Sequence, residues 1–492
     1  MATATAVGTA VNLKNFINGE SVDAMSGARM EVRDPATGEL VGTVPKAGAE
    51  DARKAIDAAE AAFEPWSDTT PDERGHFLHK AHDAVAAHHD ELALLLSREQ
   101  GKPVMEAKTE IEHFLHGIEF YASLASKVRG DYVPLPNFPN KGAFGMVLKQ
   151  PIGVCVGISP WNFPITLTGT KIGPALAGGN TIVVKPASST PMTAIRVVEL
   201  MNEVGIPKGV LNIVTGPGST CGEELISNPK VRRVAFTGET KTGRHLMEVA
   251  GRDFKRVTLE LGGSDPMVVC DDADLDRAAT MTSVGRFYNC GQLCISVKRL
   301  YVFEAIYDQF VEKIIGKVKK LKVGVGTDKD TRMGPLHNDS QRREIQEQVE
   351  DAIARGAKVL AGAKHLTNGF KTTNFYEPTL LENVPHDARV VQEEVFGPAL
   401  PIFRVKDLDE AIKLANSSPY GLGSSIWTKD LAKANKYAKK IQAGICWINS
   451  LHYGYDELPF GGVKGSGIGR EHGPEALDYY FEPKSVIYAG MA

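Results

Sequence analysis

Gly153-Val-Cys-Val-Gly-Ile158, followed downstream by Thr181-Ile-Val-Val-Lys185, is the stretch of sequence that decides the fold. Both segments are short and rich in β-branched residues, which is typical of strands buried in a parallel sheet. Three more segments of this kind follow, at 210–214, 233–236 and 256–260. Helical segments separate the strands, beginning near Ile165, Pro191 (with Thr190 as its cap), Ser219 and Lys241. This alternation predicts an α/β domain with a right-handed parallel sheet and helices on both faces.

A sheet of this topology binds dinucleotides at the carboxyl ends of its strands, so the predicted domain is Rossmann-like. The fingerprint Gly-x-Gly-x-x-Gly is not present in the sequence. The nearest glycine turns are Gly216-Pro-Gly218 and Gly238-Glu-Thr-Lys-Thr-Gly243, and either turn alone is equally compatible with an ordinary loop.

The residues ahead of this domain predict a hairpin and three helices. Asn18-Gly19 is a type I′ turn signal. An alanine-rich helix is expected over 49–63, and Thr70-Pro71 predicts an N-cap with proline at N1 for a helix that Gly101 ends. Another helix is expected over 104–128, and the prolines at 130–150 then predict an exposed arm or hairpin of the kind that serves assembly.

A second α/β series begins after Gly262-Gly263. Its expected elements are a strand over 267–270, a helix over 274–288, a strand over 299–303 and helices from about Ala305 and Gln341. Two α/β domains are therefore expected, and the cleft between them is the natural place for a binding site.

Length and composition exclude several classes of protein. With 492 residues, of which 42% are hydrophobic and 24% charged, the sequence predicts a globular protein of two or three domains. A net charge of −4 provides no basic surface for nucleic acid or an anionic membrane. No apolar run approaches the ~20 residues of a membrane helix, and residues 1–8 lack the basic start and apolar core of a signal peptide.

The 6 cysteines are too sparse for a disulfide framework, and no paired Cys-x-x-Cys or histidine cluster suggests a metal site. A reducing, cytoplasmic location is expected. One cysteine, Cys294, follows Gly291-Gln292, where glycine lets the backbone approach a ligand and a thiol can face a cleft as a nucleophile. The alternative is a small buried hydrophobic residue. Cys290, four residues earlier, is either a structural thiol or a redox partner of Cys294.

Motifs along nearly the whole chain carry a resemblance to a known family. They are, in order, Pro160-Trp-Asn-Phe-Pro164, Lys185-Pro-Ala-Ser-Ser-Thr-Pro191, Leu259-Glu-Leu-Gly-Gly263, Gly291-Gln-Leu-Cys294 and Glu393-Glu-Val-Phe-Gly-Pro398, followed by Pro459-Phe-Gly-Gly-Val-Lys-Gly-Ser-Gly467. A chain with these motifs in this order resembles the aldehyde dehydrogenase superfamily, in its hydrolytic branch that does not acylate coenzyme A.

The resemblance implies an NAD(P)-dependent oxidation of an aldehyde to the carboxylic acid. Cys294 would add to the aldehyde to give a thiohemiacetal, which loses hydride readily and leaves a thioester. Asn162 would stabilise the oxyanion together with the Cys294 backbone N–H, although an asparagine there could instead cap the next helix. Glu260 would act as general base on Cys294 and on water, and its presence favours water over coenzyme A as acyl acceptor. Glu471 matches a glutamate used as a proton relay.

The resemblance also implies the cofactor contacts. Lys185 and Glu394 would bind the adenosine and nicotinamide riboses, with Phe396 and Trp161 beside the nicotinamide. Further cofactor contacts are expected from Ile158, Ser188, Gly218, Gly238, Glu239 and Leu261.

Two departures from the family pattern concern the cofactor. Many NAD-preferring members carry a glutamate three residues after the lysine, where this chain has Ser188. Exchanging a carboxylate for a hydroxyl removes repulsion of a 2′-phosphate, so NADP is expected to be well accepted or preferred, with NAD also used. Glu239 replaces the usual serine near the pyrophosphate, which it should repel unless it points to solvent or pairs with Lys241 or Arg244.

The substrate pocket is the least constrained prediction. Aligned pocket positions are Phe163, Thr166, Leu167, Thr170, Tyr288, Gly454 and Phe460. The mixture of aromatic faces and hydroxyls suits an aromatic or medium aliphatic aldehyde or a small hydroxyaldehyde. Members acting on succinate semialdehyde share the serine after the lysine but place arginines at the positions of Thr170 and Tyr288, where a guanidinium would pair the distal carboxylate.

Three alternatives remain at this level: a succinate-semialdehyde-type dehydrogenase, a hydrolase that cleaves thioesters or esters with the same cysteine and no cofactor, and a dinucleotide-binding structural protein without turnover. The resemblance implies a division into a dinucleotide-binding domain (1–129 and 152–262), an α/β catalytic domain (263–479) and a small β oligomerisation element (130–151 and 480–492). It also implies a homodimer or homotetramer.

Overall fold

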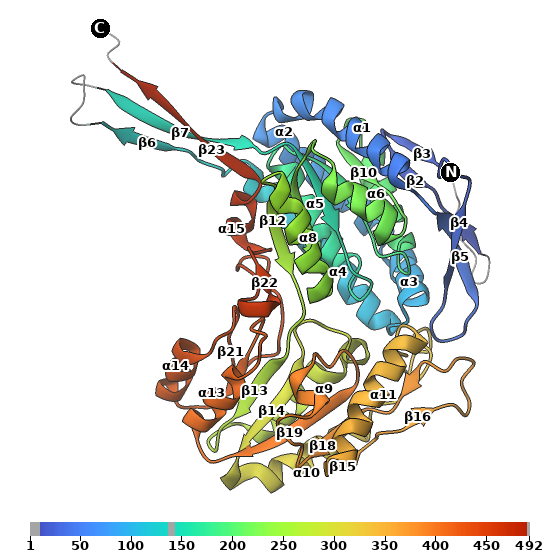
Figure 1. Cartoon of the computed structure of the whole chain (residues 1–492), viewed down its shortest axis with the longest axis vertical. Helices are drawn as coiled ribbons and strands as arrows, with labels where there is room; N and C mark the ends of the chain where they lie inside the picture. Colours follow the sequence, from blue (N-terminus) through green and yellow to red (C-terminus); the bar gives the residue numbers. More distant parts are fainter. Residues whose placement is uncertain (1–9, 136–142, 490–492) are drawn as a thin grey trace.

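The computed structural model describes residues 10–135 and 143–489. The predictions for the first eight residues, for the tip of the arm and for the last three residues lie outside the described residues. The chain forms two large α/β bodies and a projecting three-stranded element (Figure 1).

The predicted strands of the first body are confirmed as a parallel sheet. Its core is β8 (Val154–Ile158), β9 (Thr181–Lys185), β10 (Leu211–Ile213), β11 (Val231–Thr237) and β12 (Arg256–Glu260). Within the described residues this sheet has eight strands in the order β22-β12-β11-β8-β9-β10-β2-β3. The chain runs outward from β8 in both directions, so the strand order reverses between β8 and β11, and ligands bind at the carboxyl ends beside such a switch point.

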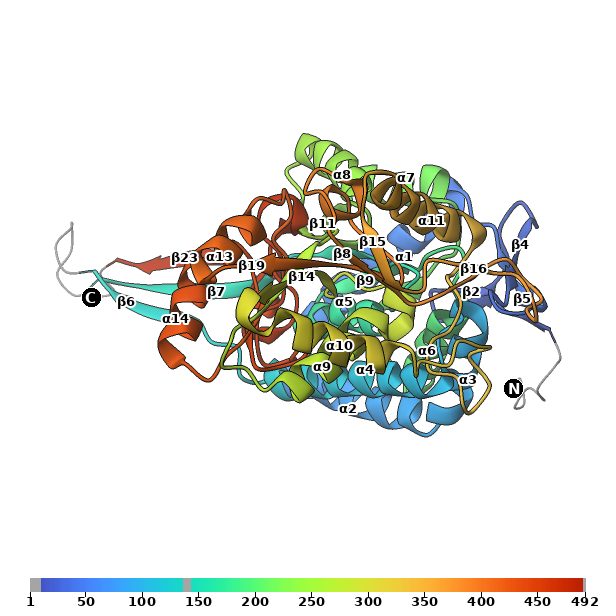
Figure 2. The same ribbon diagram turned by 90° about the horizontal axis from the view of Figure 1, so that it is seen from below.

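The outer strands of this sheet are antiparallel. β2 (Asn15–Ile17) and β3 (Glu20–Val22) form the predicted hairpin, with Asn18 and Gly19 at φ 53° and 75°. β22 (Gly467–Ile468) comes from the C-terminal part of the chain and pairs with β12. Figure 2 shows α1 (Ala49–Ser67), α7 (Glu223–Ser227) and α8 (Thr240–Arg252) on one side of β8 and β9, and α4 (Val104–Ala125) and α5 (Thr166–Ala177) on the other.

Two helix predictions need correction. The helix that begins at Thr70 is two helices, α2 (Pro71–Ala86) and α3 (His89–Gln100), because the chain leaves helical geometry at His88, where ψ is 17°. Helix α6 (Met192–Glu203) is not capped by Thr190. Its first amides donate instead to the buried carboxylate of Glu99, from Met192 N at 2.8 Å and Thr193 N at 2.9 Å. A capping group from another helix is invisible in the local sequence.

The second body is built on a sheet whose seven described strands run in the order β15-β18-β19-β14-β13-β20-β21. Its strands are β13 (Asp265–Val269), β14 (Val297–Phe303), β15 (Lys358–Ala361), β18 (Thr379–Glu382), β19 (Ala399–Val405), β20 (Ser425–Trp427) and β21 (Trp447–Ile448). Its helices are α9 (Leu275–Phe287), α10 (Tyr307–Val318), α11 (Asp339–Ala354), α12 (Arg389–Gln392), α13 (Leu408–Asn416) and α14 (Leu431–Lys440).

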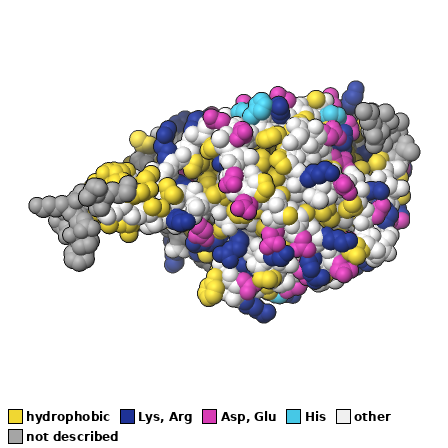
Figure 3. Space-filling view, turned by 90° about the horizontal axis from the view of Figure 1, so that it is seen from above, with side chains coloured by type: hydrophobic (Ala, Val, Ile, Leu, Met, Phe, Trp, Pro, Cys, Tyr) yellow, Lys and Arg dark blue, Asp and Glu magenta, His cyan; other side chains and the backbone are white. Residues whose placement is uncertain are grey.

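The projecting element joins β6 (Asp131–Pro134), β7 (Phe144–Pro151) and β23 (Phe481–Tyr488). β23 pairs with β7 over eight residues, from Phe481↔Pro151 to Tyr488↔Phe144. Apolar side chains gather on this element (Figure 3). Its position away from both bodies agrees with the predicted arm.

Shorter elements complete the fold: β1 (Val11–Asn12), β4 (Arg29–Arg33), β5 (Leu40–Pro45), β16 (His365–Leu366), β17 (Phe375–Tyr376), α15 (Gly473–Asp478) and the turns of helix η1 (Gly218–Gly222), η2 (Tyr288–Gly291), η3 (Glu304–Ile306) and η4 (Lys464–Ser466). In the described part of the chain no helix combines the length and the apolar character needed to cross a bilayer.

Candidate active site

Two hollows meet at Cys294, between the two large bodies. One is an apolar cavity of about 230 Å³, and the other is a more polar cleft of about 620 Å³. Cys294 lines both. The polar cleft is bounded by the carboxyl ends of β11 and β12 on one side and by Gln341 and Phe396 of the second body on the other. A thiol here can reach a small apolar molecule and a dinucleotide at once.

The loop that carries Cys294 is held by buried contacts. Asn289 and Cys290 have left-handed backbones, at φ 46° and 56°, and glycine follows at φ 72°. The fully buried Arg286 donates to Gly291 O at 3.1 Å and to Val395 O at 3.0 Å, which ties the loop to the following motif. The thiols of Cys290 and Cys294 are both free.

Burial raises the pKa of the Cys294 thiol to about 12. Lys298 opposes this increase, while the carboxyl groups of Glu260, Glu394 and Asp265 add to it. The resting thiol is therefore protonated at neutral pH and needs a base.

Asn162 lies in the loop after β8 and lines the polar cleft together with Cys294. Its Nδ2 donates to Gln292 O at 3.0 Å, two residues before the nucleophile. One amide hydrogen is thus used to fix the side chain, and the second is available to an oxyanion on a molecule bound to Cys294.

A buried polar cluster, formed by Lys102 just before α4 and by Glu106 and Glu110 on α4, supports the backbone of Asn162. Lys102 Nζ, which pairs with Glu110, donates to Asn162 O at 2.7 Å. Glu110 Oε1 accepts Ile165 N at 2.8 Å at the start of α5. Glu106, whose pKa burial raises to about 8, accepts Asn289 N at 2.8 Å.

Glu260 ends β12 and faces the polar cleft. The carboxyl is buried, and neither oxygen has a hydrogen-bond partner among the described residues. Burial raises the pKa of Glu260 well above its usual range, and the nearby Glu471 adds to the shift. A buried carboxyl without a protein partner can take a proton from a thiol or from water.

Glu471 is buried and lies close enough to Glu260 to raise the pKa of that carboxyl. Its carboxylate pairs with Lys171 Nζ at 2.8 Å and accepts the Thr170 hydroxyl at 2.7 Å. Lys171 also donates to Thr237 Oγ1 at 2.8 Å. Thr170, expected in the substrate pocket, therefore points toward Glu471.

The expected cofactor residues fall into two groups. Trp161, Gly238, Glu239, Leu261, Glu394 and Phe396 line the polar cleft. Ile158, Lys185, Ser188 and Gly218 lie farther along the same edge, at the ends of β8 and β9 and at the start of η1. A chain of contacts at the carboxyl edge of the sheet fits an extended dinucleotide.

Lys185 shows that the far end of this edge suits an anion. Its ammonium is buried and donates to Pro186 O at 3.2 Å, and no carboxylate of the described residues lies within 4.0 Å of it. Burial lowers the pKa of Lys185. Ser188 donates to Gly216 O at 3.0 Å, and a Cβ at Gly218 would meet no atom within 4 Å. Glu239 is exposed at the rim of the cleft and forms no ion pair with Lys241 or Arg244.

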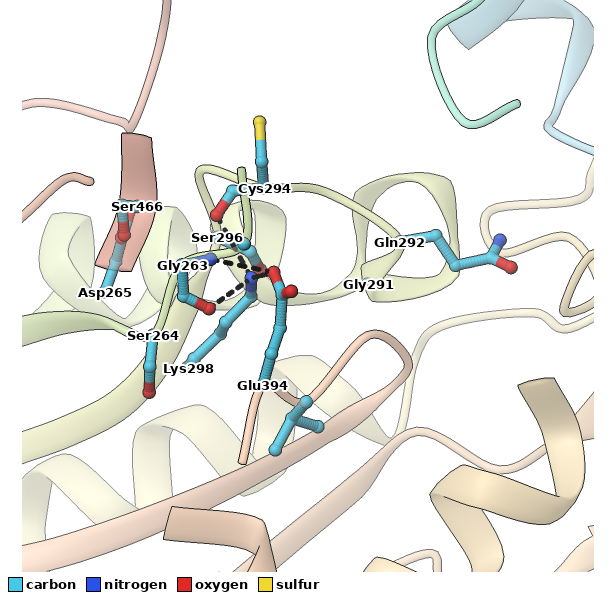
Figure 4. A network of polar contacts seen from close by, with 12 residues as sticks. Gly263, Ser264, Asp265, Gly291, Gln292, Cys294, Ser296, Lys298, Glu394 and Ser466 are labelled. Carbon is cyan, nitrogen blue, oxygen red and sulfur yellow. Dashed lines mark hydrogen bonds and ion pairs between the residues drawn. The ribbon is translucent and has the colours of Figure 1, made fainter. Parts of the chain in front are cut away.

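The part of the cleft where the nicotinamide is expected has aromatic walls and a fixed carboxylate. Trp161 stacks on His337 at 4.5 Å and meets Phe396 edge-on at 5.5 Å. Glu394 accepts Gly263 N at 3.0 Å and pairs with Lys298 at 2.5 Å (Figure 4).

The apolar cavity contains the other expected substrate residues, namely Phe163, Thr166, Leu167, Tyr288, Gly454 and Phe460. Its polar end is a histidine and aspartate cluster that the sequence did not single out. Tyr453 OH lies 2.6 Å from His113 Nε2. Asp456 lies 2.7 Å from both His472 Nδ1 and His116 Nδ1, and these histidines lower the pKa of Asp456 against the effect of burial. No lysine or arginine of the described residues lines this cavity.

Comparison with known proteins decides the family. The family model described as "Aldehyde dehydrogenase family" matches residues 22–486. The chain belongs to the aldehyde dehydrogenase family.

Relatives of this aldehyde dehydrogenase include a glutarate-semialdehyde dehydrogenase of Pseudomonas putida, 44% identical over 95% of this chain and 96% of the relative. The NADP(+) succinate-semialdehyde dehydrogenase of Escherichia coli is 42% identical, with 95% and 96% covered. Among solved structures, an E. coli NADP-dependent enzyme superposes with a TM-score of 0.95 at 41% identity, covering 97% and 98% of the two chains. A Staphylococcus aureus betaine aldehyde dehydrogenase in complex with NAD+ gives 0.93 at 37% identity, covering 96% and 94%.

The predicted family, α/β fold and enzymatic activity of this aldehyde dehydrogenase are thereby confirmed: it is an NAD(P)-dependent oxidoreductase acting on aldehydes. The sequence missed the buried lysines of the site, Lys102, Lys171 and Lys298. His113 and His116 on α4 gave a weak signal of the polar end of the cavity, because residues three apart lie on one face of a helix.

Proposed function

We propose that this aldehyde dehydrogenase converts its substrate to a free carboxylic acid through a covalent adduct on Cys294. Glu260 takes the thiol proton, and the sulfur adds to the aldehyde carbon, so that a C–S bond forms and the carbonyl oxygen becomes an oxyanion. Asn162 Nδ2 and the Cys294 backbone N–H donate to that oxygen. Bound NAD(P) supplies the hydride acceptor.

The hydride leaves the substrate carbon, and a thioester on Cys294 remains. Glu260 passes the first proton onward and then takes a proton from water. The hydroxide adds to the thioester carbon, and the C–S bond breaks to release the acid and the Cys294 thiolate, which regains a proton from Glu260. The contacts of Glu471 with Lys171 and Thr170 support a role in passing the proton onward. The observation that carries the proposal is the position of Cys294 in both hollows, with Asn162 and the unpaired carboxyl of Glu260 on the cleft side.

For the cofactor we propose that NADP is well accepted or preferred and that NAD is also used. The support is the buried ammonium of Lys185, which has no carboxylate partner in the part of the chain that the structure describes, and the hydroxyl of Ser188 three residues later. A solvent-poor cation without a counter-ion gains most from a 2′-phosphate. The two E. coli proteins that this chain resembles are both described as NADP-dependent, which points the same way.

For the substrate we propose an aromatic, medium aliphatic or small hydroxylated aldehyde. The cavity has apolar walls and a neutral-to-acidic polar end, without a guanidinium or ammonium to pair a distal carboxylate. The alternative is a dicarboxylic semialdehyde, which the names of the glutarate- and succinate-semialdehyde relatives favour.

We also propose the division into 1–129 with 152–262, 263–479, and 130–151 with 480–492, assembly of a homodimer or homotetramer through the projecting element, and a cytoplasmic location. The separate sheets support the division, with one exception. Gly467–Ile468, which belongs to the proposed catalytic domain 263–479, pairs with β12 in the first sheet. The 6 free cysteines support a reducing compartment.

A single-turnover experiment tests the chemistry. Glu260→Gln should release reduced nicotinamide more slowly, because Glu260 takes the thiol proton, and should stop after about one per site, because water is no longer activated. Cys294→Ala should release none. A Glu260→Gln enzyme that turns over at the wild-type rate would exclude Glu260 as the base, and a Cys294→Ala enzyme that turns over at the wild-type rate would exclude Cys294 as the nucleophile.

A panel of aldehydes of equal length separates the substrate classes. Each aldehyde would carry a neutral, hydroxylated or carboxylated far end, and kcat/KM would be measured with NADP and with NAD. The neutral and hydroxylated members should lead. A panel led by succinate or glutarate semialdehyde would establish the alternative, and a hundredfold preference for NAD would contradict the cofactor proposal.

A further inference from the structure

The side chain of Lys298 is buried, and its ammonium group contacts the backbone of the nucleophile, Cys294. None of the proposed steps uses it. Its side chain has an exposed fraction of 0%. Nζ donates to Cys294 O at 3.0 Å, to Gly263 O at 2.8 Å and to Glu394 Oε1 at 2.5 Å. Figure 4 shows these contacts converging on Lys298, while the sulfur of Cys294 points the opposite way.

The three acceptors belong to three separate segments. Cys294 lies on the loop after α9, Gly263 lies between β12 and β13, and Glu394 follows α12. An ammonium has three N–H donors, so all of them are used. Lys298 therefore fixes the carbonyl of the nucleophile relative to the end of the dinucleotide-binding sheet and to the carboxylate at the nicotinamide end.

Glu394 is held in one orientation by these contacts. Its Oε1 accepts both Lys298 Nζ and Gly263 N, the latter at 3.0 Å. Its Oε2 accepts no hydrogen bond from the described residues, and Glu394 lines the polar cleft. The oxygen left free is the one that can accept hydroxyl groups of a bound ligand.

We propose that Lys298 is a positioning residue that joins the nucleophile loop to the cofactor-side carboxylate, so that the thiol and the nicotinamide-ribose site are assembled as one unit. This inference rests on the proposed function, in which Glu394 binds that ribose. Because the hydrogen bonds of Lys298 go to backbone carbonyls and to Glu394, and its ammonium lies over the Phe396 ring at 5.6 Å, it acts through these groups and takes no part in bond making.

The opposite charges of Lys298 and Glu394 provide a test that ordinary destabilisation cannot imitate. Burial raises the pKa of Cys294, Lys298 opposes the increase, and Glu394 adds to it. Removal of the ammonium should therefore disfavour the thiolate, and removal of the carboxylate should favour it. Both changes should weaken cofactor binding, because in each variant the side chain at position 394 is no longer held in the orientation that lets it accept the ligand's hydroxyl groups.

The experiment compares Lys298→Met, Glu394→Gln and the double variant. Without cofactor, alkylation of Cys294 by iodoacetamide at pH 8, followed by peptide mass spectrometry, should slow by about three- to tenfold in Lys298→Met and accelerate in Glu394→Gln. The Kd of NADP, from calorimetry, should rise by about tenfold or more in each single variant. The double variant should bind NADP no more weakly than Glu394→Gln alone.

Lys433→Met is the matched control, since Lys433 pairs with Asp271 at 2.6 Å on the outside of the second body. Wild-type alkylation and NADP binding in Lys298→Met would overturn the inference, as would additive losses in the double variant. If Lys298→Met does not fold, Lys298→Arg replaces it: alkylation should stay close to wild type while NADP binding weakens, and unchanged NADP binding would overturn the inference. Failure of the proposed function would be seen separately: the wild-type enzyme would then fail to reduce NADP with every aldehyde tested.

Discussion

At the scale of single residues, the site places a protonated thiol near a buried carboxyl group. Burial raises the pKa of Cys294 to about 12 and that of Glu260 well above its usual range. The thiol is therefore not ionised at neutral pH in the free enzyme, and reaction requires Glu260 to take its proton. The unpaired oxygens of Glu260 provide the place for that proton.

The pH dependence of alkylation tests the state of the thiol. Because only the thiolate reacts and the pKa of Cys294 is about 12, the rate of alkylation of the cofactor-free enzyme should rise about tenfold per pH unit from pH 7 to pH 10. Peptide mass spectrometry after timed exposure to iodoacetamide measures the rate. A plateau near pH 9 would mean that the thiol ionises like a free cysteine.

At the scale of elements, the arm is a β-sheet that leaves apolar side chains uncovered. Tyr132 on β6 and Ile487 on β23 are each 66% exposed. Phe144 stacks on Tyr488 at 4.7 Å and lies 5.3 Å from Tyr132, so the sheet has an aromatic face. Exposed apolar side chains gathered on a projecting sheet are typical of an interface between subunits.

The oligomeric state tests this role of the arm. Tyr132→Asp with Ile487→Asp should shift the protein to a smaller species in sedimentation velocity, because charge on an apolar interface loses solvation without gaining a partner. Leu431→Asp is the control, since Leu431 is 71% exposed on α14, outside the arm. An unchanged sedimentation coefficient in the arm variant would show that assembly uses another surface.

At the scale of the whole molecule, buried carboxyls make stability depend on pH. Burial raises the pKa of Glu99 to about 7 and that of Glu106 to about 8, from 4.5. Where the folded protein holds a proton that the unfolded chain has lost, stability falls as pH rises. The stabilisation is therefore complete below pH 4.5 and is lost progressively up to the folded pKa.

Glu106→Gln isolates this contribution. The free energy of unfolding of the wild type should fall by up to about 1.4 kcal/mol per pH unit more steeply than that of the variant between pH 4.5 and pH 8, and then run parallel to it. Urea titrations at several pH values measure the difference. Parallel curves across the whole range would show that Glu106 ionises normally.

The sequence by itself determined the alternation of strands and helices, because this follows from local periodicity. It also predicted a cleft between two α/β bodies, and it predicted Cys294, Asn162 and Glu260 as site residues because they stand in contiguous motifs that resemble those of the family. Only the tertiary structure decided what surrounds them. Lys298 meets Glu394 across 96 residues, Lys171 meets Glu471 across 300, and His116 meets Asp456 across 340. The partner of a buried charge depends on which distant segments pack together, and no local pattern records that choice. The same reason explains why Glu99, and not Thr190, caps α6.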